Sequence, residues 1–131
     1  MTTAFAPEKD IPEDFWRFIE ANQTDDQVRA SLAGMSKEEV VTLFKSCLEA
    51  RTELAYQLAE TGRSEDASED ALDDLSEGII SEGRRVYLDS YHGRTALPPH
   101  DEWERKRGLI HLFAAVYRQR YGGNVFDEVE E

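Results

Sequence analysis

Arg51 is the residue whose position in the sequence points most directly to chemistry. Apolar side chains recur at intervals of three and four from Val40 to Leu58, which is the period of an α-helix. Arg51 falls at the centre of this apolar stripe, so its guanidinium must either be paired or reach an opening. We expect an internal ion pair with a carboxylate on a facing helix. The alternatives are an anion or ligand contact in a cleft, or a place at an oligomer interface.

An acidic stretch supplies the second set of candidate residues. Between residues 60 and 82 the chain carries nine acidic side chains and one basic side chain. Such a face is either solvated, with charges that suit a helix start, or docks a basic protein partner through complementary charge. The candidate binding residues on this stretch are Asp70, Asp73, Asp74 and Glu77. Exposed aromatic side chains, such as Trp103 or Tyr91, could anchor the same partner.

The remaining reactive residue types form no catalytic or metal-binding signature. The three histidines match no zinc spacing, and the run Ser64–Leu75 lacks the central glycine of a calcium loop. The sequence has no nucleophile elbow, phosphate-binding loop, dinucleotide-binding fingerprint or HExxH motif. Cys47 lies in an apolar stripe, as a small buried hydrophobe would. We therefore predict no metal and no cofactor, and we favour a non-enzymatic protein over an enzyme or small-ligand-binding protein with a pocket around Arg51.

The elements that must position these residues are helices. The apolar period is helical throughout, and no segment alternates with the period of a strand. The pattern predicts three long helices over 37–61, 71–91 and 100–121, and short helices over 12–22 and 24–34. The predicted fold class is therefore all-α, a compact bundle of three long and one or two short helices.

Two features bear on where these helices begin and how they pack. Ser36 and Glu39 form a capping box, in which each side chain can bind the other residue's backbone amide. Gly83 falls at the centre of the apolar stripe of the predicted 71–91 helix. A glycine inside a helix costs about 1 kcal/mol relative to alanine, so we expect the close approach of another helix to compensate.

Length and charge narrow the class of protein. The 131 residues fit a single domain, and we predict that residues 1–11 and 124–131 are loose tails. No apolar run is long enough for a membrane span, no secretory signal is evident, and one cysteine suits the reducing cytoplasm. The net charge of −13 opposes binding to nucleic acid or to an anionic membrane. Residues 84–120 are nevertheless basic, with eight basic and four acidic side chains.

Two stretches of the sequence resemble a bacterial family. The segment Glu13–Glu20, EDFWRFIE, and the segment Asp70–Arg84, DALDDLSEGIISEGR, are similar to the bacterial domain-of-unknown-function family numbered 4240. That family opens with an F-W-x-x-I-type helix and later carries an acidic turn before a helix that ends in an I-S-x-G-like stretch. Gly78 stands where the family pattern has an aromatic residue. The resemblance implies a bacterial cytoplasmic helical domain and assigns no catalytic residue.

These observations predict a non-enzymatic, acidic protein-binding module of the bacterial cytoplasm. An immunity- or antitoxin-like inhibitor, or a regulatory adaptor, has this combination of small size, negative charge and missing catalytic motifs. The expected partner is a basic protein, with no nucleic acid and no membrane involved. The protein itself is expected to be a monomer or a homodimer, in the second case through the face that carries Gly83.

Overall fold

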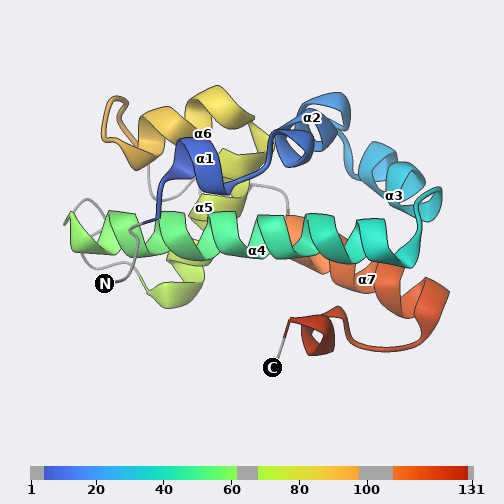
Figure 1. The fold of residues 1–131 in the computed structure, drawn as a ribbon. Coiled ribbons are helices and arrows are strands. Elements are labelled where there is room, and N and C mark those ends of the chain that lie inside the picture. Colours follow the sequence, from blue (N-terminus) through green and yellow to red (C-terminus); the bar gives the residue numbers. More distant parts are fainter. Residues whose placement is uncertain (1–4, 62–67, 98–107, 130–131) are drawn as a thin grey trace.

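The fold is built from helices joined by short connections. The computed structural model describes residues 5–61, 68–97 and 108–129, and within those ranges it contains helices and no strand (Figure 1). The helices are α1 (Pro7–Asp10), α2 (Glu13–Ala21), α3 (Asp25–Ala33), α4 (Lys37–Glu60), α5 (Glu69–Ser81), α6 (Arg84–Tyr91), α7 (Leu109–Tyr121) and the 3-10 helix η2 (Val125–Glu128). The predicted all-α fold class is confirmed.

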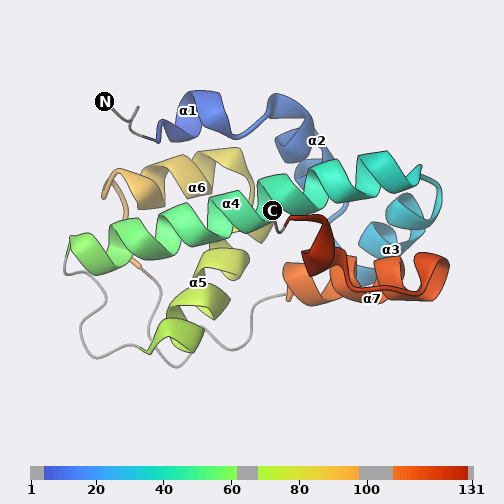
Figure 2. The same cartoon turned by 60° about the horizontal axis from the view of Figure 1, so that its bottom comes forward.

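Helix α4 is the axis around which the other helices pack. It makes contacts with α2, α5, α6, α7 and η2. In the two ribbon views, α1, α2 and α6 lie along one side of α4 and α7 lies along the other (Figures 1 and 2). Its fully buried apolar side chains recur at intervals of three and four, as the sequence predicts: Val40, Phe44, Cys47, Ala50, Leu54 and Leu58. Burial of this stripe is what brings Arg51, which lies within it, into the interior.

The predicted start of α4 is confirmed in atomic detail. The Glu39 amide donates to Ser36 Oγ at 3.1 Å, and the Ser36 amide donates to Glu39 Oε1 at 3.1 Å. Helix α3 begins in the same way, with a reciprocal pair between Thr24 and Gln27. Both starts are therefore satisfied by residues within one turn of the helix they open.

The predicted continuous helix over 71–91 is wrong. The chain breaks at Gly83, whose φ of 108° is open to glycine and strained for other residues, so that α5 ends at Ser81 and α6 begins at Arg84. A Cβ on Gly83 would lie 3.2 Å from Glu20 Oε2 of α2. The glycine thus serves a turn and a close approach at once, and the helix that approaches it is α2, through the carboxylate of Glu20.

The two predicted loose tails are also corrected where the structure describes them. Residues 7–10 form α1, with Pro7 and Ile11 buried, and Phe5 contacts Tyr91 at a ring-centroid distance of 5.8 Å. At the other end, Val125 is fully buried. These segments are too short to display a helical period, but each carries apolar side chains that cover the core.

Two further predictions fall wholly or partly on residues outside the described ranges. The last long helix is predicted to begin near residue 100, whereas α7 begins at Leu109, and residues 98–107 lie outside the described ranges. Trp103, the predicted aromatic anchor, is among them. Within the described ranges, no helix combines the length and the apolar character required to cross a membrane.

Candidate functional site

Arg51 forms the internal ion pair that the sequence predicts. Its Nη1 lies 3.3 Å from Glu77 Oε2 of the facing helix α5. The Arg51 side chain is 20% exposed and that of Glu77 only 5%, so the pair is largely withdrawn from water. In such surroundings each charge depends on the other, because an unpaired charge in the interior costs several kcal/mol.

Glu77 extends this pair to a third helix. Its second oxygen, Oε1, accepts a hydrogen bond of 2.9 Å from the amide of Ile110 in the first turn of α7. The N-cap of α7 is Gly108, which has no side chain to supply this acceptor. Glu77 therefore caps α7 from α5 while it neutralises Arg51 of α4. The nearby Cys47 is fully buried, and burial, followed by the negative charge of Glu77, raises the pKa of its thiol.

The structure separates the four acidic side chains predicted to bind a partner into exposed and buried ones. Asp70 and Asp74 are exposed, and Asp73 is half-buried. Glu77 is 4% exposed, so its assignment to an exposed acidic face is wrong. Helix α5 contacts α2, α4, α6 and α7, so side chains on more than one of its faces are buried. A helical wheel assumes a single buried face and therefore placed Glu77 on the exposed side.

A groove of about 330 Å³ adjoins Arg51, as the ligand-pocket alternative requires. Its lining comprises Arg51, Thr52, Ala55, Tyr56, Ala59, Leu72 and Asp73. The Arg51 Nε has no hydrogen-bond partner within the described part of the chain. However, Glu77 neutralises the guanidinium and Asp73 adds a negative charge to the lining, so the groove offers no excess positive charge to an anion.

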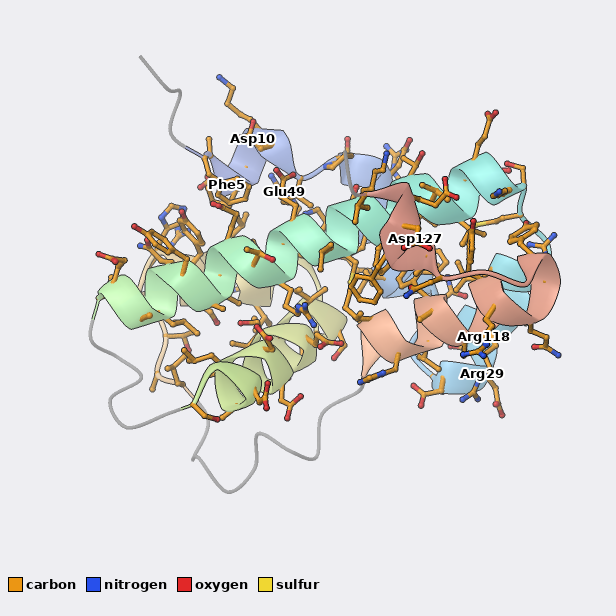
Figure 3. The ribbon with its side chains drawn as sticks, turned by 90° about the horizontal axis from the view of Figure 1, so that it is seen from below. Phe5, Asp10, Arg29, Glu49, Arg118 and Asp127 are labelled. Atoms are coloured by element: carbon orange, nitrogen blue, oxygen red, sulfur yellow. The ribbon has the colours of Figure 1, made fainter. Side chains whose placement is uncertain are left out.

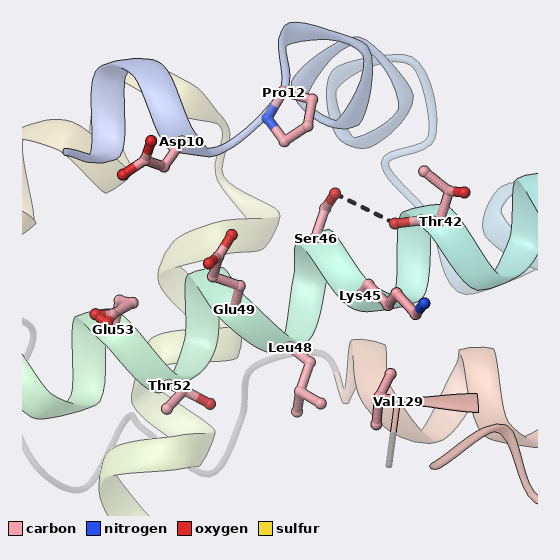
Figure 4. Close-up of a pocket in the computed structure, with 10 residues that line it drawn as sticks. All are labelled: Asp10, Pro12, Thr42, Lys45, Ser46, Leu48, Glu49, Thr52, Glu53 and Val129. Atoms are coloured by element: carbon pink, nitrogen blue, oxygen red, sulfur yellow. Dashed lines mark hydrogen bonds between the residues drawn. The ribbon is translucent and has the colours of Figure 1, made fainter. Parts of the chain in front are cut away.

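A larger groove, of about 560 Å³, lies between α4 and the chain around α1, and the sequence did not reveal it (Figure 4). We call it the acidic groove. Its lining comprises Asp10, Pro12, Thr42, Lys45, Ser46, Leu48, Glu49, Thr52, Glu53 and Val129. Three of these side chains are carboxylates and one is an ammonium group. The carboxylates come from two elements, and Asp10 of α1 faces Glu49 of α4 (Figures 3 and 4).

The carboxylates of the acidic groove repel one another. Partial burial, followed by the charges of Asp10 and Glu53, raises the pKa of Glu49 above its usual range. Within the described residues, neither Glu49 nor Glu53 takes part in an ion pair. Like charges four residues apart on a helix cost about 0.2–0.5 kcal/mol. The groove thus keeps an unfavourable concentration of negative charge.

The sequence contained little that could have identified this groove. Glu49 and Glu53 look like the solvated face of α4, and Asp10 falls in a segment predicted to be loose. The three carboxylates come together because α1 packs against α6 and lies across the groove from α4. Among the described residues, no group of three or more His, Cys, Asp or Glu side chains is arranged to hold a metal ion.

Comparisons with known proteins identify no relative. No family model matches the chain, and no curated protein and no solved structure matches it. The resemblance to family 4240 stays a prediction. The functional assignment therefore rests on the geometry of the molecule itself.

Proposed function

We propose that this protein is a non-enzymatic binding module that docks a basic segment of a protein partner in the acidic groove. The observation that supports this proposal is the convergence of Asp10, Glu49 and Glu53 on a groove whose lining includes one cation. An incoming lysine or arginine side chain would relieve their mutual repulsion. It would also form charge-assisted hydrogen bonds, which are roughly twice as strong as neutral ones.

The rest of the lining suits the same type of ligand. Leu48, Pro12 and Val129 present apolar surface beside the carboxylates. Lysine and arginine carry an aliphatic stem behind the charged group, and such stems pack against apolar surface. The net charge of −13 would attract a basic partner over a longer range and accelerate the encounter.

The acids at the start of α5 support the proposal less well. Asp70 lies in the first turn of α5, where a carboxylate is stabilised by the helix dipole without any partner. Glu49 and Glu53 lie in the interior of α4 and gain nothing comparable from it. The clustering of Glu49 and Glu53 is therefore better evidence for a binding surface than the acids at the start of α5. We assign the docking surface to the acidic groove.

A titration with a short alanine–arginine peptide tests the proposal. Peptide affinity is measured for the wild type, for Glu49→Gln with Glu53→Gln, and for Asp70→Asn with Asp74→Asn, at low and high salt. Both double variants remove two negative charges, so they differ only in the surface that they change. We expect about tenfold weaker binding, or ~1.4 kcal/mol, for the groove variant and a change below about twofold for the α5 variant. The wild-type affinity should fall as salt increases.

Two results would contradict this assignment. Equal losses in the two variants would mean that the peptide responds to net charge alone. A larger loss in the α5 variant would place the docking surface on α5 instead. Backbone amide shifts recorded during the same titration locate the peptide, and those of α1 and α4 around the acidic groove should move most.

A stability measurement separates lost binding from lost folding. The pKa of Glu49 is raised in the folded state, so its ionised form opposes folding at neutral pH. Glu49→Gln should therefore raise the free energy of unfolding at pH 7 by up to about 0.5 kcal/mol. This gain should fade as the pH falls through the pKa of the folded carboxyl, because the wild-type group then takes up its proton. Urea unfolding at pH 7 and pH 4 checks both statements.

We also propose a biological role for a protein that binds a basic partner in this way. A cytoplasmic immunity- or antitoxin-like inhibitor would cover a basic functional surface of its target, and a regulatory adaptor would use the acidic groove to recruit one. A toxin gene beside the gene for this protein would support the inhibitor, and a metabolic operon would favour ligand binding at the Arg51 groove. Light scattering distinguishes a monomer from a homodimer.

A further inference from the structure

Residues 5–11, which we call the N-terminal strap, are held against α6 by two side-chain contacts. Glu8 Oε2 lies 2.7 Å from His92 Nε2 at the end of α6. The ring of Phe5 lies 5.8 Å from that of Tyr91, which in turn stacks on Tyr87 at 6.3 Å. The strap thus covers an aromatic surface whose inner member, Tyr87, is fully buried.

The opposite edge of the strap meets repulsion. Asp10 belongs to the strap and faces the carboxylates of Glu49 and Glu53 on α4 across the acidic groove (Figure 4). One edge is therefore held by an acid–imidazole pair, and the other is pushed away by like charges. Both of these interactions depend on groups that take up protons.

We propose that the N-terminal strap is a pH-responsive cover, which closes more tightly on α6 and α4 as the pH falls from about 8 to about 5 and loosens as it rises. Histidine is the side chain whose charge ordinarily changes in this range. A charged imidazole at His92 makes an ion pair with the Glu8 carboxylate, whereas a neutral imidazole makes only a hydrogen bond to it. The pKa of Glu49 is raised by partial burial and by the charge of Asp10, and protonation of Glu49 removes its repulsion against Asp10.

The surrounding groups do not reverse these directions. A backbone hydrogen bond and the hydrogen bond from His92 hold the pKa of Glu8 below its usual range, so Glu8 stays ionised. Burial raises the pKa of Tyr91, so that its hydroxyl stays neutral. Arg94 pairs with Asp89 at 3.5 Å, and its positive charge also helps to lower the pKa of Glu8. Lys45 and Glu53 of α4 line the acidic groove beside the strap, and the charge of Glu53 also raises the pKa of Tyr91.

The expected size of the pH effect on strap closure follows from the solvent exposure of His92 and Glu8. The His92 and Glu8 side chains are 36% and 46% exposed, so solvent screens their attraction. An exposed ion pair changes a closing equilibrium by up to about fivefold. The strap should therefore be mostly closed at both ends of the pH range and open several times more often at pH 8.

Amide hydrogen exchange of the free protein tests this inference without any ligand, so it stands or falls separately from the proposed function. The probes are the amides of Lys9 and Asp10, which donate to Ala6 O at 2.9 and 2.8 Å only while α1 is formed. Their protection factors, corrected for the intrinsic effect of pH on exchange, should rise up to about fivefold between pH 8 and pH 5.5. A second readout is the intensity of ring contacts between Phe5 and Tyr91.

Matched variants assign the effect to its groups. In His92→Gln the amide can still donate to Glu8 but cannot titrate, so the rise in protection should largely disappear. His111→Gln removes an exposed histidine of α7 and should leave the rise intact. Glu49→Gln should increase protection at pH 8. An unchanged wild-type protection factor, or a rise that persists in full in His92→Gln, would overturn the inference.

Discussion

Helices α3 and α4 begin in a different way from α6 and α7. The first two are capped by their own sequence, through the reciprocal pairs Thr24 with Gln27 and Ser36 with Glu39. The last two have glycine at the N-cap and no local side-chain acceptor. Their amides are satisfied by carboxylates from other helices.

The distant caps are specific. Glu20 Oε2 of α2 accepts from the Arg84 amide of α6 at 3.1 Å, and Glu77 Oε1 of α5 accepts from the Ile110 amide of α7 at 2.9 Å. The end of α3 shows the same device with opposite charge, because Arg120 Nη1 donates to Leu32 O at 2.8 Å and to Met35 O at 2.7 Å. Such helix ends are satisfied only after the tertiary structure has formed.

Among the local caps and the caps supplied by distant helices, the largest loss of stability is expected when Glu77 is replaced. Glu77→Ala removes the α7 cap and leaves Arg51 without its partner in the interior, so it should lower the free energy of unfolding by about 3 kcal/mol. Urea unfolding followed by circular dichroism measures this loss. A loss below about 1 kcal/mol would mean that the pair is solvated and that the cap matters little.

A double variant and a thiol probe sharpen this result. Arg51→Met combined with Glu77→Leu should recover the part of the loss that comes from the unpaired charge, because an apolar pair replaces a buried ion pair with little penalty, while the Ile110 amide still lacks its acceptor. Cys47 is fully buried in the native protein and should resist thiol reagents. Its labelling rate should rise in Glu77→Ala and return toward the wild-type rate in the double variant.

The next largest effect is expected at the turn between α5 and α6. Gly83→Ala places a side chain at a φ of 108° and brings Cβ to 3.2 Å from Glu20 Oε2, so both the backbone and the distant cap are disturbed. We expect a loss of about 1–3 kcal/mol in thermal or urea unfolding. Gly122→Ala is a useful control, because that glycine also has positive φ but an added Cβ would meet nothing within 4 Å.

A smaller effect is expected from a local cap. Ser36→Ala should cost about 1 kcal/mol, because it removes the acceptor for the Glu39 amide at the start of α4. The same change should lower the helix content of an isolated peptide that covers residues 34–50, since the cap needs no tertiary structure. No change in the peptide would show that the capping box also depends on the folded protein.

The smallest effect is expected from the exposed distant cap. Glu20→Ala removes the acceptor for the Arg84 amide, but this site is exposed and water can replace the carboxylate, so the loss should be about 0.5 kcal/mol. Hydrogen exchange of the first amides of α6 should rise while those of α3 stay unchanged. Equal changes in both helices would point to a global loss of stability instead of a lost cap.

At the ion pair of Arg51 and Glu77, the sequence predicted the burial of the arginine but not the identity of its partner. The helical period placed Arg51 in the core and favoured a carboxylate partner over a ligand contact or an oligomer interface, and the structure provides that carboxylate. The choice of Glu77 could not be foreseen, because the same reasoning assigned this residue to an exposed face. The acidic groove was missed because Asp10 faces Glu49 only after α1 has packed against α6, across the groove from α4.

Local chemistry in the sequence determined the all-α class, the stripe that α4 buries and the capped starts of α3 and α4. These features depend on residues within about one turn of each other, so the chain order alone specifies them. The tertiary structure alone decided the break at Gly83, the partner of Arg51 and the gathering of carboxylates beside α1. Each of these depends on which of the 28 acidic side chains comes near a given group in space, and hydrogen bonds and ion pairs act only over a few ångströms.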